Sequence, residues 1–167
     1  MEQKDNYGLL LRPDVKLHRQ YFNEMVKLIG IQVIYRSCKP DKHWTLYTEI
    51  DSNYNPPELV GCIFDEHPTQ RTMKKLGWDS ELSTDVAIIS VPYDLVGLQV
   101  GCLFIVPSGI DHAKGRLFRV TKLSNIMAYP ASITCEIVPE YEDTMSKSEL
   151  DFTHSSFNVL NDEEDDL

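Results

Sequence analysis

The hydrophobic pattern of this chain changes once, at Gly30, and that change limits the possible folds more than any other feature of the sequence. Before Gly30, a segment that opens at Pro13 carries apolar residues at helical spacing, so it predicts one amphipathic helix that packs on the rest of the protein. The apolar positions of this helix are Val15, Phe22, Met25, Val26 and Ile29. After Gly30, short β-branched and aromatic runs alternate with proline, glycine and asparagine, which is typical of strands joined by turns.

Seven such runs follow the predicted helix, and seven short strands indicate a barrel or a sandwich. The predicted strands are Ile31–Arg36, Thr45–Ile50, Leu59–Phe64, Val86–Val91, Cys102–Val106, Arg116–Leu123 and Ser132–Val138. Between the third and the fourth, we expect a short helix that begins near Pro68 or Thr69 and ends at Gly77. The sequence therefore predicts a mainly β fold, a small β-barrel or sandwich of about seven strands with one N-terminal amphipathic helix.

The formal net charge of −10 lies wholly at the C-terminal end of the 167-residue chain. Residues 136–167 contain 11 acidic side chains and the single Lys147, whereas the acidic and basic side chains of residues 1–135 cancel. A neutral body without a basic stripe has little electrostatic attraction for nucleic acid. We therefore do not expect a protein that reads a DNA or RNA sequence.

Charge and apolar content divide the chain into three parts. We predict an N-terminal arm at residues 1–12, a domain of helix plus β-barrel at residues 13–141, and an acidic, largely disordered C-terminal tail at residues 142–167. Phe152, Phe157, Val159 and Leu160 interrupt the acidic tail. Because they are too few to form a core, we expect them to dock on another surface during assembly; the alternative is that the tail merely tolerates them.

No apolar run approaches the roughly 18 to 20 residues that a membrane-spanning helix needs. The first ten residues also lack the basic-then-apolar order of a secretory signal. We therefore expect a protein that is soluble where it is made, with Cys38, Cys62, Cys102 and Cys135 as free thiols. The last three cysteines lie in strand-like apolar runs, so their default interpretation is as small hydrophobic residues.

Two Cys-x4-His spacings offer a sharper interpretation of two of these cysteines. Cys38 with His43, and Cys62 with His67, supply the sulfur and imidazole ligands that zinc takes. The separations are not those of the usual zinc fingers, and nothing in the sequence brings all four to one side of a fold. We therefore predict no metal site.

The nearest candidate for catalysis is Asp65-Glu66-His67 at the end of a predicted strand, where a general acid–base or hydrolytic metal site could form. Adjacent strand residues point to opposite faces, so the two carboxylates converge only at a turn, which Pro68 favours. The chain lacks a P-loop, a dinucleotide-binding Gly-x-Gly-x-x-Gly and a Gly-x-Ser-x-Gly elbow. We predict that the protein is not an enzyme and holds no cofactor; a small metal-dependent hydrolase is the alternative from another class.

Aromatic rings fall at strand ends and in loops as often as in strand centres, and protein interfaces favour such rings. Some of these rings, with the leucines of the arm, one residue of a projecting loop and two phenylalanines of the tail, are the candidate subunit-interface residues. These candidates are Leu9, Leu10, Leu11, Trp44, Tyr54, Trp78, Tyr93, Ile110, Phe152 and Phe157. The alternative for the rings is that they cap the ends of the barrel.

Two runs in the second half of the chain share a recognisable order. Gly101-Cys102-Leu103-Phe104-Ile105-Val106-Pro107 is followed by Leu117-Phe118-Arg119-Val120. Further runs in the same pattern are Gly30–Tyr35, Leu46–Glu49, Lys75–Trp78, Val91–Pro92 and Pro130–Glu136. From Pro13 to about Tyr141, the chain resembles the neck, or head-closure, proteins of tailed bacteriophages, with Cys102 in place of the usual acidic residue.

The resemblance implies a small β-barrel with an added helix, acting as a structural subunit of the virion. Such a subunit forms a homo-oligomeric ring at the head–tail junction, between the portal or its adaptor and the tail terminator or tail proteins, and it is assembled in the host cytoplasm. DNA passes through the ring without sequence-specific binding. A tail terminator or another connector component is a related alternative. A third option is an acidic adaptor that binds host factors through Phe152–Leu160.

Overall fold

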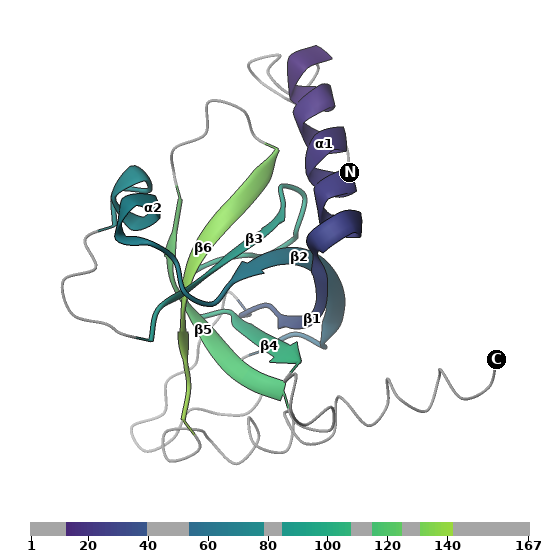
Figure 1. Ribbon diagram of the computed structural model, residues 1–167. Coiled ribbons are helices and arrows are strands. Elements are labelled where there is room, and N and C mark those ends of the chain that lie inside the picture. The colour runs from purple at the N-terminus through teal and green to yellow at the C-terminus, as the bar shows by residue number, and fades with distance from the viewer. Residues whose placement is uncertain (1–12, 40–53, 79–84, 108–114, 125–130, 142–167) are drawn as a thin grey trace.

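The structure, a computed structural model, describes residues 13–39, 54–78, 85–107, 115–124 and 131–141. These residues form a closed barrel of six antiparallel strands with two helices on its outside (Figure 1). The predicted mainly β class and the N-terminal helix are confirmed. The predicted arm at residues 1–12 and the predicted tail at residues 142–167 lie outside the described residues.

The strand bounds predicted from turn residues and β-branched runs agree closely with those of the structure. The elements are α1 (Pro13–Ile29), β1 (Ile31–Arg36), β2 (Glu58–Asp65), α2 (Gln70–Lys75), β3 (Ala87–Pro92), β4 (Leu103–Pro107), β5 (Gly115–Leu123) and β6 (Ser132–Pro139). β1 has its predicted bounds, and each end of the other five strands agrees with its prediction within one residue. The predicted strand Thr45–Ile50 lies outside the described residues, so the barrel has six described strands rather than about seven.

The barrel consists of two three-stranded meanders joined at both edges. Its strand order is β1-β2-β3-β6-β5-β4, and residues 93–102 cross from β3 to β4. β3 pairs with β6, and β1 pairs with β4, where Ile34 lies opposite Ile105 and Tyr35 lies opposite Phe104. Because the ladder closes on itself, the described strands leave no free edge, and the fold is a barrel rather than a sandwich.

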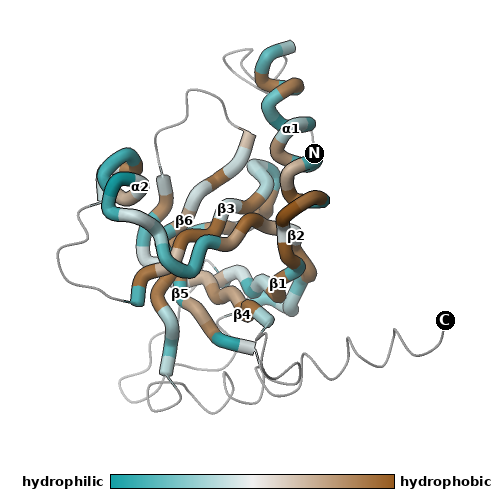
Figure 2. The backbone as a smooth tube through the Cα atoms, viewed as in Figure 1, coloured by the Kyte–Doolittle hydropathy of each residue, from teal (hydrophilic) through white to brown (hydrophobic). Residues whose placement is uncertain are grey.

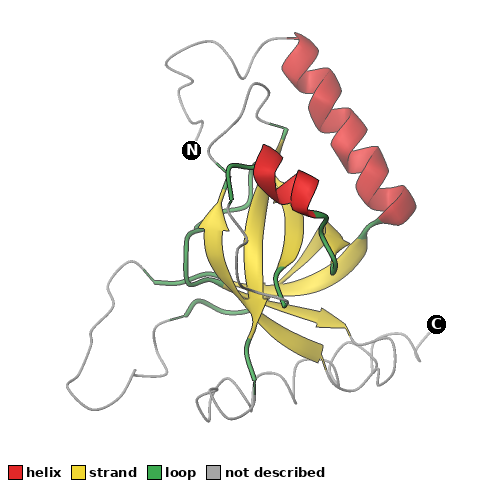
Figure 3. Cartoon of the chain, turned by 60° about the vertical axis from the view of Figure 1, so that its left-hand side comes forward, coloured by secondary structure: helices red, strands yellow, loops and turns green. Residues whose placement is uncertain are grey.

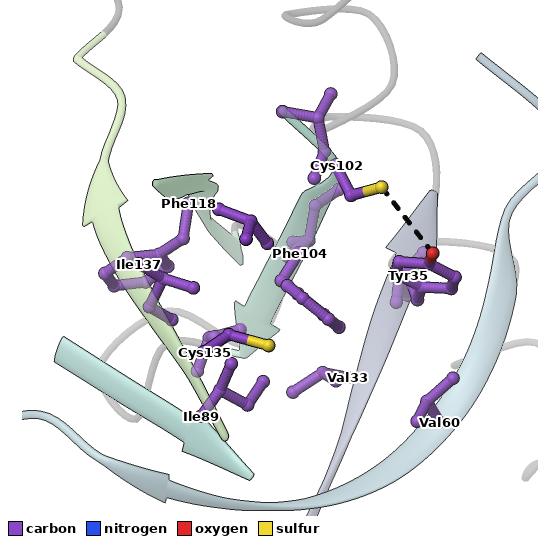
Figure 4. Close-up of a cluster of buried hydrophobic side chains, with 14 of the residues drawn as sticks. Val33, Tyr35, Val60, Ile89, Cys102, Phe104, Phe118, Cys135 and Ile137 are labelled. Atoms are coloured by element: carbon purple, nitrogen blue, oxygen red, sulfur yellow. Dashed lines mark hydrogen bonds between the residues drawn. The ribbon is translucent and has the colours of Figure 1, made fainter. Parts of the chain in front are cut away.

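Alternate residues of each strand point into the barrel and fill it, as the period of a β-strand requires. Tyr35 and Phe104 stack across the β1–β4 seam with ring centroids 5.0 Å apart, and Phe64 meets Phe118 at 5.7 Å. Figure 4 shows the core, to which Val33, Tyr35, Val60, Ile89, Cys102, Phe104, Phe118, Cys135 and Ile137 belong. Cys62 and Cys135 are fully buried there, which confirms their interpretation as small core residues.

Helix α1 lies on the outside of the barrel and packs against β2 and β3 (Figure 3). Val15 and Phe22 are buried, and Val26 lies against the outer side of β2 at Gly61. The helix ends at Gly30, whose N–H donates to the Val26 carbonyl at 2.8 Å just before β1 begins. Ile29, the last residue of the predicted stripe, is 60% exposed, so the prediction that it packs on the barrel is wrong. The rest of the predicted stripe faces the barrel, with Met25 and Val26 half-buried.

A capping residue at each end determines where helix α2 begins and ends. The Thr69 side chain accepts a hydrogen bond in the first turn, and Gly77, with a φ of +73°, ends the helix. Beyond this glycine, the Trp78 N–H donates back to the Met73 carbonyl at 3.0 Å. Met73 and Trp78 then pack on Ile88 of β3, so the short helix shields the outer side of that strand.

Replacement of Gly30 by alanine tests the junction between α1 and β1. A Cβ there would lie 2.3 Å from the Val26 carbonyl oxygen and 2.7 Å from that of Cys62, and both are backbone atoms. We expect Gly30→Ala to lower the free energy of unfolding by about 1 to 3 kcal/mol in urea titrations followed by circular dichroism. Gly61→Ala is the control, because its Cβ would meet only side-chain atoms, a Val26 methyl group at 2.9 Å and the Gln32 amide nitrogen at 3.5 Å. Equal losses in the two variants would contradict this account.

Candidate functional site

The crossover at residues 93–102 seals one end of the barrel through a network around one sulfur atom. The Tyr35 hydroxyl donates to the Val96 carbonyl at 3.3 Å and lies 3.6 Å from the Cys102 Sγ. The same sulfur accepts from the Gln99 N–H at 3.4 Å and lies 3.4 Å from the Gly97 carbonyl. The dashed line in Figure 4 marks the contact between tyrosine and cysteine. Residues that the sequence places far apart thus fix the crossover to β1.

The pKa of the Cys102 thiol in this network is shifted in the opposite direction to the pKa values of Cys62 and Cys135. A hydrogen bond from Cys38, with further donation from Gln99 and Tyr35, lowers the pKa of the Cys102 thiol. Burial raises the pKa of Cys62 and of Cys135 to about 12. Cys102 has no exposed surface, so a substrate cannot reach its sulfur from solvent. The arrangement is suited to holding the barrel end closed.

A second polar network lies on the outer wall of the barrel beside the same end. Arg36 on β1 and Arg119 on β5 flank Leu103 on β4, directly opposite it in register. The Arg119 guanidinium donates to the Tyr54 hydroxyl at 2.9 Å and pairs with the Glu140 carboxylate. The Arg36 guanidinium lies 5.4 Å from the Tyr54 ring, so this ring sits on the wall between two cations.

The acidic candidates for catalysis do not form a shared pocket. Asp65 ends β2, Glu66 and His67 follow it, and all three residues are exposed. The Asp65 carboxylate accepts from the His67 backbone N–H at 3.2 Å, and the Glu66 carboxylate pairs with Arg116. The Asp65 carboxylate therefore stabilises a turn, and the Glu66 carboxylate forms an ion pair.

The two cysteines of the zinc hypothesis lie far apart. Cys62 is opposite Ile31 at the start of β1, whereas Cys38 follows the end of β1. At about 3.3 Å per residue, the two positions are roughly 20 Å apart along the strand. His43 lies outside the described residues, within which no group of three or more His, Cys, Asp or Glu side chains is placed to hold a metal ion.

The structure places three of the candidate interface residues. Trp78 is buried beneath α2 on the outer side of β3, and Tyr54 is buried on the wall network. Tyr93 is partly exposed after β3, where the Arg19 guanidinium lies 3.5 Å from its ring centroid. The candidates that lie outside the described residues are Leu9, Leu10, Leu11, Trp44, Ile110, Phe152 and Phe157.

The sequence analysis missed a second apolar stripe on α1. Leu17, Tyr21 and Leu28 are 66%, 64% and 78% exposed. At about 100° per residue they fall within an arc of about 40°, on the side opposite Val15 and Phe22. Figure 2 shows apolar positions along the helix. Tyr21 follows Leu17 by four residues and Leu28 follows it by eleven, a helical spacing that is visible in the sequence. The prediction covered only the stripe that packs on the barrel.

A second exposed apolar group lies on the crossover. Val96 and Val100 are exposed there, close to the sealed barrel end, and Tyr93 begins the same segment. Scattered apolar residues are common on protein surfaces, but two groups on two defined elements indicate contact surfaces. The described part of the chain thus carries two exposed apolar groups, one on α1 and one on the crossover.

Comparison with known proteins adds no family to this geometry. No family model matches the sequence, and no curated protein matches it. Among the described helices, none is long and apolar enough to cross a membrane.

The buried thiols predict how stability changes at alkaline pH. Cys62 and Cys135 have folded pKa values of about 12 against an ordinary value of 9.0, so their contribution to stability is complete below pH 9 and is lost as the pH rises toward 12. Each thiol contributes a slope of about −1.4 kcal/mol per pH unit. Urea unfolding across this range should show a shallower decline for the Cys62→Ala, Cys135→Ala double variant. Parallel declines would contradict the assignment.

Proposed function

We propose that this protein is a structural subunit of the neck of a tailed phage. It forms a homo-oligomeric ring between the portal or adaptor of the head and the tail, and it borders the channel through which DNA leaves. The observation that carries the proposal is the exposed stripe of Leu17, Tyr21 and Leu28 on the outer side of α1. The resemblance of residues 13–141 to neck proteins supplies the biological setting.

The closed barrel determines how copies of such a subunit can meet. Strand addition needs a free sheet edge, and the described strands leave none. Lateral contacts must therefore use side chains on the outside of the barrel. The stripe on α1 is apolar, and the ion pair between Lys27 and Glu24, with a 2.9 Å contact, gives it a polar border. An apolar centre with a polar rim is the usual composition of an interface.

The exposed residues of the crossover suit a different contact. Val96 and Val100 lie at one end of the barrel, whereas the stripe of α1 lies along its side. In a ring of barrels, side surfaces meet neighbouring subunits and end surfaces meet the rings above or below. We therefore assign α1 to contacts within the ring and the crossover to contacts with the head or the tail.

Charge supports a conduit for DNA. The acidic and basic side chains of residues 1–135 cancel, so the body of the subunit offers no excess of positive charge to phosphate. Each phosphate contact adds salt-dependent affinity and would slow the passage of DNA. A neutral wall lets DNA move past without holding it.

Charge placed on the α1 stripe should abolish the ring. We expect the Leu17→Glu, Leu28→Glu double variant to elute as a monomer with an unchanged circular dichroism spectrum, because two buried carboxylates would oppose the contact. Gln20→Glu, Asn23→Glu is the matched control, since it adds the same charge at exposed positions off the stripe. Light scattering after gel filtration, with electron microscopy of the particles, measures the outcome.

Three results would overturn the proposal. The first is an unaltered chain that stays monomeric at every concentration and is absent from virion necks. The second is a ring that survives in the Leu17→Glu, Leu28→Glu variant. The third is a control variant that loses the ring to the same extent, because charge rather than the stripe would then decide assembly.

A further inference from the structure

Two cysteines that lie far apart in the sequence meet at the sealed end of the barrel. Cys38 follows β1 and Cys102 precedes β4, and both belong to the buried core as free thiols. The Cys38 thiol and the Cys38 backbone N–H both donate hydrogen bonds to the Cys102 Sγ. The Tyr35 hydroxyl lies beside the same sulfur, at 3.6 Å (Figure 4). The two sulfur atoms are therefore in direct contact.

The pairing of β1 with β4 also places these cysteines at a distance that suits a disulfide. Arg36 is opposite Leu103, and one further step of this register brings Ser37 opposite Cys102. Opposed residues of antiparallel strands have Cα atoms about 4.5 to 5.5 Å apart, and one residue along the strand adds about 3.3 Å at a right angle. The Cα atoms of Cys38 and Cys102 are thus about 6 Å apart, within the range of about 4.4 to 6.8 Å that a disulfide spans.

The other two cysteines are too far from each other for such a bond. Cys62 lies on β2 and Cys135 lies on β6, with β3 between them in the ladder. Two strand spacings amount to about 9.6 Å, beyond the roughly 7 Å at which two cysteines can be bridged without movement of the backbone. The four cysteines thus comprise one pair with the geometry of a disulfide and one pair without it.

We propose that Cys38 and Cys102 form an intramolecular disulfide when hydrogen peroxide oxidises the protein, and that this bond fastens the crossover to the end of β1. The Cys102 thiolate attacks one peroxide oxygen, the O–O bond breaks, and the sulfur becomes a sulfenic acid as hydroxide leaves. The Cys38 sulfur then attacks the sulfenic sulfur, the S–O bond breaks, and the departing hydroxide takes the Cys38 proton to become water. Two thiols and one peroxide thus give one disulfide and two water molecules, and the two electrons that the sulfur atoms lose reduce the peroxide.

The contacts of Cys102 favour it as the attacking sulfur. The Cys38 thiol, the Cys38 N–H and the Gln99 N–H stabilise its thiolate, which is the form that reacts with peroxide. Cys102 is fully buried and Cys38 is nearly so, which means that peroxide reaches them when the crossover opens locally. Residues 93–100 of the crossover belong to no strand, so they can move without breaking the ladder. We therefore expect a slow reaction.

Peroxide treatment of the full-length protein, followed by mass spectrometry of the intact chain and of its non-reduced peptides, tests the bond. We expect a loss of two hydrogen atoms per chain, a peptide pair linked through Cys38 and Cys102, and reversal by dithiothreitol. Because the bond closes a long loop between positions 38 and 102, the midpoint of thermal unfolding should rise by about 5 to 15 °C. A link between any other two cysteines, a bond between two chains, or sulfinic acid at Cys102 without a link would overturn the proposal.

Matched variants assign the effect to these two sulfur atoms. Cys38→Ser and Cys102→Ser should each lose both the mass change and the rise in the midpoint. Cys62→Ala, Cys135→Ala removes two thiols from the same core but keeps the proposed pair, so it should respond to peroxide as the unaltered protein does. Each variant is compared with itself before and after peroxide, so a change in its starting stability does not affect the result.

A midpoint that rises equally in Cys38→Ser and in the unaltered protein would contradict the proposal, as would a double variant that no longer responds. If a serine variant does not fold, the peptide map of the unaltered protein decides alone. The inference does not depend on the proposed function, since the link and the thermal midpoint are measured on the isolated protein.

Discussion

The antiparallel pairing of β1 with β4 is the constraint on which the rest of this structure depends. It joins two three-stranded meanders into a closed ladder, and it places Tyr35 against Phe104 at the centre of the core. Closure satisfies the backbone hydrogen bonds of both meander edges at once and removes the edges by which strands aggregate. The described strands therefore have no edge left for pairing, and the barrel they form can make contacts only through its outer surface and its ends.

Closure in turn requires the crossover at residues 93–102 to span the barrel end. A connection of this kind exposes backbone polar groups, which need partners when they are buried. Tyr35 and Cys102 supply them on the inner side, and the Tyr54 hydroxyl lies 3.5 Å from the Gly101 carbonyl on the outer side. The described polar groups at this end thus have a structural explanation, because they bond the crossover to β1 and to the outer wall.

Local features of this fold could be predicted from the sequence, whereas its long-range features could not. Strand bounds and the start and end of α2 follow from turn residues and from caps such as Thr69 and Gly77, which act within a few residues. The β1–β4 pairing joins segments about 70 residues apart, and no local pattern specifies it. The same distinction explains the burial of Trp78, which follows α2 and packs on Ile88 of β3. The exposed stripe of α1 was readable, but two stripes on one helix leave open which of them packs inward.

Two outer apolar surfaces meet on β2. Gly61 lies beneath Val26 of α1, and Leu59 lies two residues away on the same side of the strand, at a distance of about 7 Å. Leu59 also stands opposite Ile34, which lies in register with Ile105 on β4 and, through it, with Leu117 on β5. The face of β2 that receives α1 is therefore continuous with the apolar outer face of β1, β4 and β5.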